Sequence, residues 1–247
     1  MKRLDTRISN KTIKDFLTSK QDGLLVNKDE FGGKVNTSLV FNTKDKKYYN
    51  EASTLTGKKG SGCRSVIPDA EINFHTHPVE CYLSQSAIWG WPSGGDMTML
   101  LKMKELNKVH LVFSLEGTYL IKTNPLARKV LTPKQKEEIG YEFVKTHKYR
   151  SFDNYSKHHT YFKKEFPVLK KTKSNDTLKL WLHLANHQYF IYKKKDHKIF
   201  NIMFVPNDTF QDDNKLSKTW DTLKILNKNN ISKYVKINKT IIINPDY

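Results

Sequence analysis

The sequence of 247 residues predicts an α+β fold, and three observations support this. Short runs of β-branched and aromatic residues recur between turn residues, which is typical of strands. Between them lie segments whose apolar side chains recur at helical spacing. The chain also carries 13 Phe, 12 Tyr and 4 Trp, enough to build a sizeable core. We see no internal repeat and no run of 18 apolar residues, so no membrane span is expected.

The first half of the chain is expected to hold most of the strands. A helix is predicted at 11–19, where three apolar side chains share one face, and another at 97–107. The expected strands are residues 24–26, 38–42, 71–77, 109–114 and 118–122. The glycines of 56–63 predict a loop without the order of a phosphate-binding motif, and 78–95 are predicted to form a second, longer loop.

The second half of the chain is predicted to consist of short helices and short strands. Helices are expected at 134–147, after Thr132-Pro133, and at 216–226, whereas 177–186 fits either a helix or a strand. Strands are expected at 189–193, 199–205 and 234–244. Because Asn124-Pro125 breaks the pattern, we place a domain boundary there, between residues 1–125 and a smaller basic α+β domain of residues 126–247.

The net charge of +18 is unevenly distributed. Residues 1–125 hold 18 basic and 13 acidic side chains, whereas residues 126–247 hold 25 and 12. This excess predicts that the Lys-rich half binds nucleic acid or another polyanion. The alternative is that the lysines are solvated surface in a compositionally biased chain, since Arg, the better bidentate ligand for phosphate, is scarce. The sequence leaves both open.

Cys63 and Cys81 are the two cysteines, and neither has the spacing of a metal-binding pair. Two cysteines do not form a disulfide framework, so we interpret both as structural or incidental in a reducing setting. Residues 1–7 are charged and lack an apolar segment, so no secretory signal is expected. The expected location is intracellular, in the cytoplasm or nucleus, or in association with a virion.

The stretch Ile72–Val79, INFHTHPV, carries the chemistry. Side chains alternate along a strand, so His75 and His77 are predicted to project from the same face. Downstream, the sequence WPSGGDM supplies the hydroxyl of Ser93 and the carboxylate of Asp96. Two imidazoles and one carboxylate are the ligand set of an open zinc site, which keeps one position for water. The alternative is that the histidines are ordinary polar residues at a strand end and that Asp96 caps a helix.

This pattern resembles the signature of the JAMM/MPN+ zinc metalloproteases, H-x-H-P followed by S-x-x-D. That family also carries an upstream glutamate in an E-x-x-G context, which Glu30 matches within EFGG. The resemblance covers roughly residues 10–125 and implies one Zn²⁺ per chain, held by His75, His77 and Asp96. It further implies that Ser93 stabilises the tetrahedral intermediate and that Glu30 is the general base. The implied fold is a curved mixed β-sheet flanked by helices, with the zinc at its mouth.

The resemblance implies a zinc-dependent hydrolase of amide or isopeptide bonds, deubiquitinase-like, whose substrates are conjugates of ubiquitin or a ubiquitin-like protein. The alternative is a non-catalytic basic protein of MPN fold, structural or nucleic-acid-binding, such as a virion component.

Two features qualify the match to this family. Fifteen residues separate His77 from Ser93, more than is typical, and this insert is expected either to line the substrate groove or to block it. Three other glutamates compete with Glu30 for the role of base: Glu51 lacks its context, Glu71 lies about 13 Å along the strand from His75, and Glu80 is close in sequence.

Overall fold

The computed structural model of the protein describes residues 4–18, 25–104, 109–151, 158–193, 195–207 and 239–244. Its strands are β1 Thr6–Ile8, β2 Phe31–Asn42, β3 Lys47–Lys59, β4 Ile72–Thr76, β5 Val109–Phe113, β6 Gly117–Thr123, β7 Tyr189–Tyr192, β8 Lys195–Lys198, β9 Phe200–Pro206 and β10 Ile241–Ile243. Its helices are α1 Asn10–Leu17, α2 Val79–Ser84, α3 Gly94–Lys102, α4 Pro125–Val130, α5 Pro133–Val144, α6 His147–Arg150, α7 His158–Glu165, the 3₁₀ helix η2 Pro167–Lys171, and α8 Thr177–Asn186.

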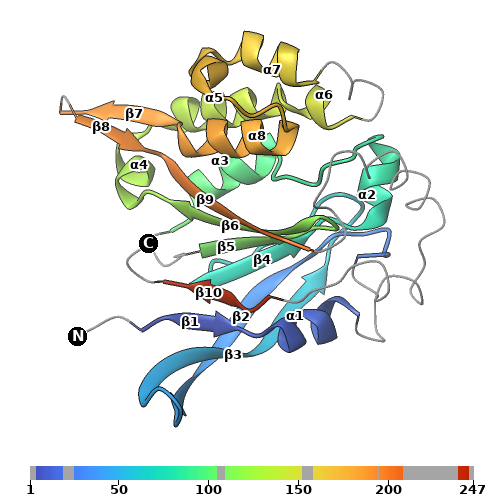
Figure 1. The fold of residues 1–247 in the computed structure, drawn as a ribbon, viewed down its shortest axis with the longest axis vertical. Helices are drawn as coiled ribbons and strands as arrows, with labels where there is room; N and C mark the ends of the chain where they lie inside the picture. Colours follow the sequence, from blue (N-terminus) through green and yellow to red (C-terminus); the bar gives the residue numbers. More distant parts are fainter. Residues whose placement is uncertain are drawn as a thin grey trace.

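A curved mixed sheet organises the described part of the chain, in the order β10-β1-β3-β2-β4-β5-β6-β9. Its strand pairs are antiparallel except β1 with β3 and β4 with β5, which are parallel. Helices α3, α5, α7 and α8 lie on one side of this sheet and α1 lies on the other (Figure 1). The predicted α+β class is therefore confirmed. None of the described helices is long and apolar enough to cross a membrane.

Local sequence signals explain where the helices beside the site begin. The Thr132 hydroxyl accepts the Gln135 N–H, and the Gln135 side chain accepts the Thr132 N–H, so a capping box precedes Pro133 and starts α5. Helix α3 lies so close to α5 that a Cβ at Gly94 would come within 2.3 Å of the Gly140 carbonyl oxygen, so glycine is needed there. This close packing fixes the first turn of α3, which carries Asp96.

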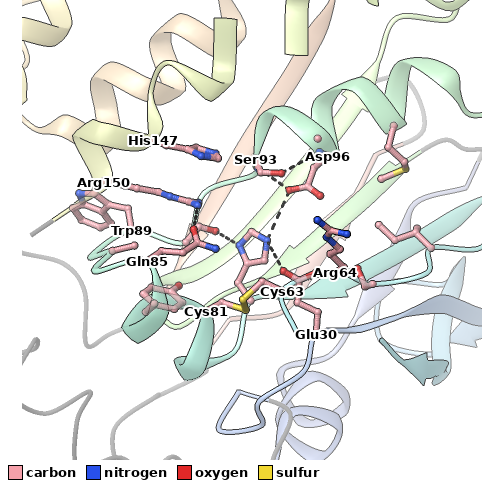
Figure 2. Close-up of a pocket in the computed structure, with 18 residues that line it drawn as sticks. Glu30, Cys63, Arg64, Cys81, Gln85, Trp89, Ser93, Asp96, His147 and Arg150 are labelled. Atoms are coloured by element: carbon pink, nitrogen blue, oxygen red, sulfur yellow. Dashed lines mark hydrogen bonds and ion pairs between the residues drawn. A yellow bond between two sulfur atoms is a disulfide. The ribbon is translucent and has the colours of Figure 1, made fainter. Parts of the chain in front are cut away.

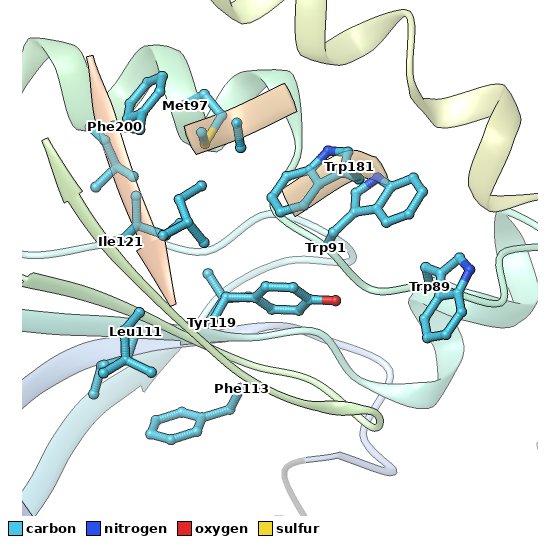
Figure 3. Close-up of a cluster of buried hydrophobic side chains, with 14 of the residues drawn as sticks. Trp89, Trp91, Met97, Leu111, Phe113, Tyr119, Ile121, Trp181 and Phe200 are labelled. Atoms are coloured by element: carbon cyan, nitrogen blue, oxygen red, sulfur yellow. The ribbon is translucent and has the colours of Figure 1, made fainter. Parts of the chain in front are cut away.

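The core between the sheet and the helices includes part of the insert between His77 and Ser93. Trp91 is fully buried and stacks on Trp181 of α8, with ring centroids 5.4 Å apart and planes within 4°. Tyr119 of β6 meets Trp181 edge-on at 5.7 Å (Figure 3). Aromatic contacts of this kind stabilise beyond the burial of their area. The insert is therefore held in place by the core.

The expected glycine-rich loop at 56–63 is wrong for residues 56–59, because β3 extends to Lys59, whereas residues 60–63 are a loop. Gly57 lies opposite Gly33 of β2, and a Cβ on Gly33 would come within 2.7 Å of Gly57 Cα and of the Phe74 ring. These glycines therefore permit a close approach of strands inside the sheet.

Other local predictions also need correction. Leu25 and Val26 lie in a turn, where the Leu25 carbonyl accepts the Val79 N–H, so the strand predicted at 24–26 is wrong for these two described residues. The predicted loop 78–95 contains α2. The ambiguous segment 177–186 is a helix, α8, whose side chains pack into the core on one face. A further strand, β8, which includes Asp196, lies between the strands expected at 189–193 and 199–205.

Strands from both halves of the chain share the main sheet. β9 pairs with the whole of β6, and β10 pairs with β1, so the two outer strands of the sheet both come from beyond residue 125. The expected boundary near 125 therefore does not separate two sheets. The helix expected at 216–226 lies outside the described residues, as do residues 234–238 of the last expected strand, of which β10 is the observed part.

Candidate metal centre

Strand β4 places two histidines at the centre of the sheet. It lies between β2 and β5, and all five of its residues are buried. His75 is fully buried and His77, directly after the strand, is 6% exposed. Their Nε2 atoms lie 2.9 Å apart, as the predicted alternation of side chains requires.

Asp96 approaches these imidazoles from the first turn of α3. Its Oδ1 lies 3.6 Å from His75 Nε2 and its Oδ2 lies 3.8 Å from His77 Nε2. The three ligand atoms all lie within 4.8 Å of one another. Tetrahedral zinc with bonds of about 2.0–2.2 Å places its ligand atoms roughly 3.3–3.6 Å apart. The three side chains therefore have the donor types and the spacing to hold a metal ion.

The hydrogen bonding of His77 leaves its Nε2 ready to bind a metal. Its Nδ1 lies 2.6 Å from the Gly90 carbonyl oxygen, which can only accept, so Nδ1 carries the proton. Burial, reinforced by the nearby charge of His75, lowers the pKa of His77 to about 3, so the ring is neutral. A neutral ring with its proton on Nδ1 presents a lone pair on Nε2.

His75 is oriented by a chain of buried polar groups. The Asn73 amide donates to the Pro68 carbonyl at 2.9 Å, so its oxygen faces His110 and accepts from His110 Nδ1–H at 2.7 Å. Burial lowers the pKa of His110 well below its usual value, so His110 Nε2 accepts from His75 Nδ1–H at 2.8 Å. This relay aims His75 Nε2 at the site, as the outer partners of metal-bound histidines do.

The site holds opposite charges before any metal binds. Burial opposes charging of His75, but Asp96 and then Glu30 outweigh it, so the pKa of His75 is raised. Burial alone would raise the pKa of Asp96, but the neighbouring His75, and after it His77, hold this pKa far below its usual value. A protonated His75 also explains its short contact to His77, because His75 Nε2–H donates to the bare His77 Nε2.

Glu30 and Asp96 approach the site from different sides (Figure 2). It precedes β2 and is 7% exposed, with Oε1 3.7 Å from His77 Nε2. Burial is the main cause that raises the pKa of Glu30 to about 7. The competing glutamates Glu51, Glu71 and Glu80 are all exposed to solvent, away from the centre. The structure therefore brings Glu30 to the site and leaves its sequence rivals outside.

Ser93 lies at the N-terminus of α3 and lines the same pocket. Its hydroxyl oxygen accepts the Asp96 N–H at 3.2 Å, while its own N–H donates to Asp96 Oδ2 at 2.6 Å. The helix cap is therefore Ser93, and the Asp96 carboxylate completes a capping box while its other oxygen faces His75. The hydroxyl proton of Ser93 is not used by this cap.

His75, His77 and Asp96 form the metal triad, and two of them, His77 and Asp96, line a cavity of about 530 Å³. The insert lines one side of this cavity with residues from Cys81 to Gly90, so it forms a wall and does not fill the space. Cys81 forms a disulfide with Cys63, whose Cα is 5.7 Å from that of Cys81. This bond joins the insert to the segment between β3 and β4, a pairing that the sequence did not lead us to expect.

Sequence reasoning also missed Glu116, which is fully buried behind the insert. Its carboxylate accepts from the Gly90 N–H and the Tyr119 hydroxyl, both at 2.7 Å, and from the Tyr82 hydroxyl. The Gly90 peptide thus bonds to Glu116 on one side and to His77 on the other. A lone glutamate in the strand pair 109–123 carries no sequence signal for this role, and neither does His110.

Comparisons with known proteins give one partial match. The protein named "Uncharacterized protein 3R" of Frog virus 3 (isolate Goorha) is 39% identical to this chain over 83 residues. These residues are 32% of this chain and 18% of that protein, so the chain spans less than a fifth of the relative's length. No protein-family profile matches the sequence. No solved structure matches the fold.

Proposed function

We propose that the chain is a zinc-dependent hydrolase of amide or isopeptide bonds, of the JAMM/MPN+ type and deubiquitinase-like. The observation that carries the proposal is the convergence of His75, His77 and Asp96 with the buried carboxylate of Glu30, 3.7 Å from His77. The resemblance of the sequence around these residues to that family supports the choice of zinc. The curved mixed sheet flanked by helices is consistent with the fold that the resemblance implies.

His75, His77 and Asp96 would hold the metal. Bound there, Zn²⁺ would supply a Lewis acid that polarises the scissile carbonyl and lowers the pKa of a coordinated water. The Nδ1 atom of His75 hydrogen-bonds to His110, and that of His77 to the Gly90 carbonyl. These hydrogen bonds fix the direction in which each Nε2 points.

Glu30 is placed to move the proton. A group with a pKa of about 7 accepts a proton from water and returns it to a leaving amine at physiological pH. Its burial also strengthens its interaction with charges that develop nearby. Ser93 is placed to donate its free hydroxyl proton to the oxyanion of the tetrahedral intermediate.

The experiment that tests this function is incubation of the purified protein with a panel of linked ubiquitin dimers. Cleavage of at least one linkage is expected, and a metal chelator is expected to abolish it. Full cleavage in the presence of the chelator would rule out a metal-dependent mechanism. If dimers of every linkage stay intact, ubiquitin conjugates would be excluded as substrates.

A second candidate function, binding of a polyanion, is favoured by the excess of 25 basic over 12 acidic residues beyond residue 125. On this view the chain is a basic structural or nucleic-acid-binding protein, such as a virion component, and the partial match to a viral protein is in keeping with it. Binding to duplex DNA should then weaken steeply as salt rises. No binding at low salt would leave the lysines as solvated surface. An intracellular or virion-associated location is likewise a proposal.

A further inference from the structure

We propose that the cavity beside the metal triad binds an oxyanion group of the substrate, a carboxylate or a phosphate, through the guanidinium of Arg150. The inference rests on the proposed function, which places the scissile bond of the substrate near the metal triad. It narrows that function to amides that carry an anionic group next to the reacting carbonyl.

Arg150 is a buried cation without an ionic partner in the part of the chain that the structure describes. It ends α6, lines the cavity and is 6% exposed. Its Nη2 donates to the Gln85 side-chain oxygen, and its Nη1 lies 3.4 Å from the Trp91 carbonyl. Both acceptors are neutral, and no described carboxylate lies within ion-pair distance of the guanidinium. A buried charge normally needs a counter-charge, so this one is suited to a ligand.

His147 adds a second unpartnered group to the same wall. It lies one helical turn before Arg150 on α6 and lines the cavity. Its Nε2 is buried and has no hydrogen-bond partner among the described residues. Burial lowers the pKa of His147 to about 4, so the ring is neutral at physiological pH. Figure 2 shows His147 and Arg150 on one side of the site and Arg64 on the other.

The charges around the cavity favour an anion once a metal is bound. Four side chains that carry formal charge line it: Glu30, Asp96, Arg64 and Arg150. Their formal charges sum to zero when Glu30 is ionised, and a bound divalent cation, which requires a neutral His75, would leave a net charge of +2. An isopeptide substrate without a charged group near its scissile bond has nothing to pair with Arg150. A carboxylate or phosphate does, because the guanidinium fork matches two of its oxygens at once.

The test measures binding of three probes by calorimetry to the zinc-loaded full chain and to the chelated chain. The probes are N-acetyl-Gly-Gly with a free C-terminal carboxylate, the same peptide with a C-terminal amide, and inorganic phosphate. We expect the zinc-loaded protein to bind the carboxylate peptide, phosphate or both, and to bind the amide peptide at least tenfold more weakly than the carboxylate form. Which anion binds more tightly distinguishes a carboxylate substrate from a phosphate substrate.

Arg150→Gln should weaken anion binding at least tenfold, while Arg150→Lys should retain part of it. The matched control is Arg128→Gln, since Arg128 is also buried, at 8% exposed, but donates to the Lys104 carbonyl and lies outside the cavity lining. Zinc content and the thermal midpoint report whether each variant is folded. If Arg150→Gln does not fold, Arg150→Lys, which keeps the charge but loses the guanidinium fork, takes its place, and undiminished anion binding by that variant would overturn the inference.

Three results would overturn the inference: equal, measurable binding of the two peptides, no binding of either anion, or undiminished anion binding by Arg150→Gln, which would place the anion on the metal alone. These outcomes are separate from the fate of the proposed function. Cleavage of ubiquitin dimers without anion binding would retain the hydrolase and remove the oxyanion site. Anion binding that depends on Arg150, without any hydrolysis, would do the reverse.

Discussion

The Nδ1 of His75 lies 2.8 Å from the Nε2 of His110, and both rings are completely buried. His110 belongs to β5, which runs parallel to β4, and it faces His75 from the neighbouring strand. It takes the place that a carboxylate or backbone carbonyl commonly has behind a metal-bound imidazole.

Removal of this outer partner should weaken metal binding. His110→Ala is expected to lower zinc affinity roughly 10–100-fold, because His75 loses the acceptor that fixes its tautomer and direction. His110→Gln should lose less, since an amide oxygen can accept the same proton. Competition with a fluorescent chelator measures the affinity. His197→Ala, a change on β8 in the separate two-stranded sheet, is the control, and equal affinities of the His110→Ala and control proteins would refute the relay.

Glu30→Gln should separate metal binding from chemistry. The amide keeps the size of the side chain and removes its ability to take a proton, so zinc content is expected to stay at the wild-type level. Hydrolysis of a ubiquitin dimer should fall roughly 10²–10⁴-fold. Glu71→Gln and Glu80→Gln, which alter exposed glutamates, should leave the rate unchanged. A Glu30→Gln protein with wild-type activity would assign the base elsewhere.

Zinc affinity should rise with pH because His75 must lose a proton to bind. The pKa of His75 is raised, chiefly by Asp96 against the opposing effect of burial, so the metal-free ring is charged below that pKa. Affinity should therefore increase about tenfold per pH unit below the His75 pKa and level off above it. The pKa of His77, about 3, means that His77 adds no slope near neutral pH.

This pH dependence is best measured in Glu30→Gln, so that the Glu30 carboxyl, whose pKa of about 7 lies in the same range, does not contribute. The slope then counts the protons that zinc displaces from the imidazoles. A flat profile across the acidic range, or a slope of two, would contradict the assigned protonation states.

The Cys63–Cys81 disulfide should stabilise the wall of the cavity. The two cysteines are 18 residues apart in the sequence, and a loop of that size is expected to contribute about 3 kcal/mol to the free energy of unfolding. Urea denaturation of the Cys63→Ser/Cys81→Ser protein against the wild type measures this, with reduced wild type as a second reference. Equal stability of the oxidised wild type and the double variant would show that the crosslink does not form in solution.

Much of the candidate site could be predicted from local sequence. Alternation along a strand was enough to place His75 and His77 on one face, and the resemblance around EFGG singled out Glu30 among four glutamates. The helix that presents Asp96 followed from its strong helix formers. These are short-range patterns, in which neighbours in the sequence are neighbours in space.

The remaining features depend on contacts between distant residues. His110 and Glu116 act through neighbouring strands and the insert, and Arg150 is held at the cavity by the bond from the Ile88 N–H to its carbonyl and by its contact with the Trp91 carbonyl. The glycines of β2 and β3 were misleading, because glycine marks both loops and close strand contacts. The expected strands at 199–205 and 234–244 were not foreseen to pair with β6 and β1 across the boundary placed at residue 125, since sequence shows that a strand exists and not which strand it pairs with.

The most direct test of the account is the metal content of the purified chain, measured by inductively coupled plasma mass spectrometry. The wild type is expected to carry about one zinc per chain, as a site with three protein ligands does, and His75→Ala/His77→Ala is expected to carry almost none. His183→Ala/His187→Ala, which removes a neighbouring pair of imidazoles on α8 and its C-terminal cap, is the matched control and should retain the zinc. A wild type without zinc, or an unchanged zinc content after loss of His75 and His77, would contradict the central claim.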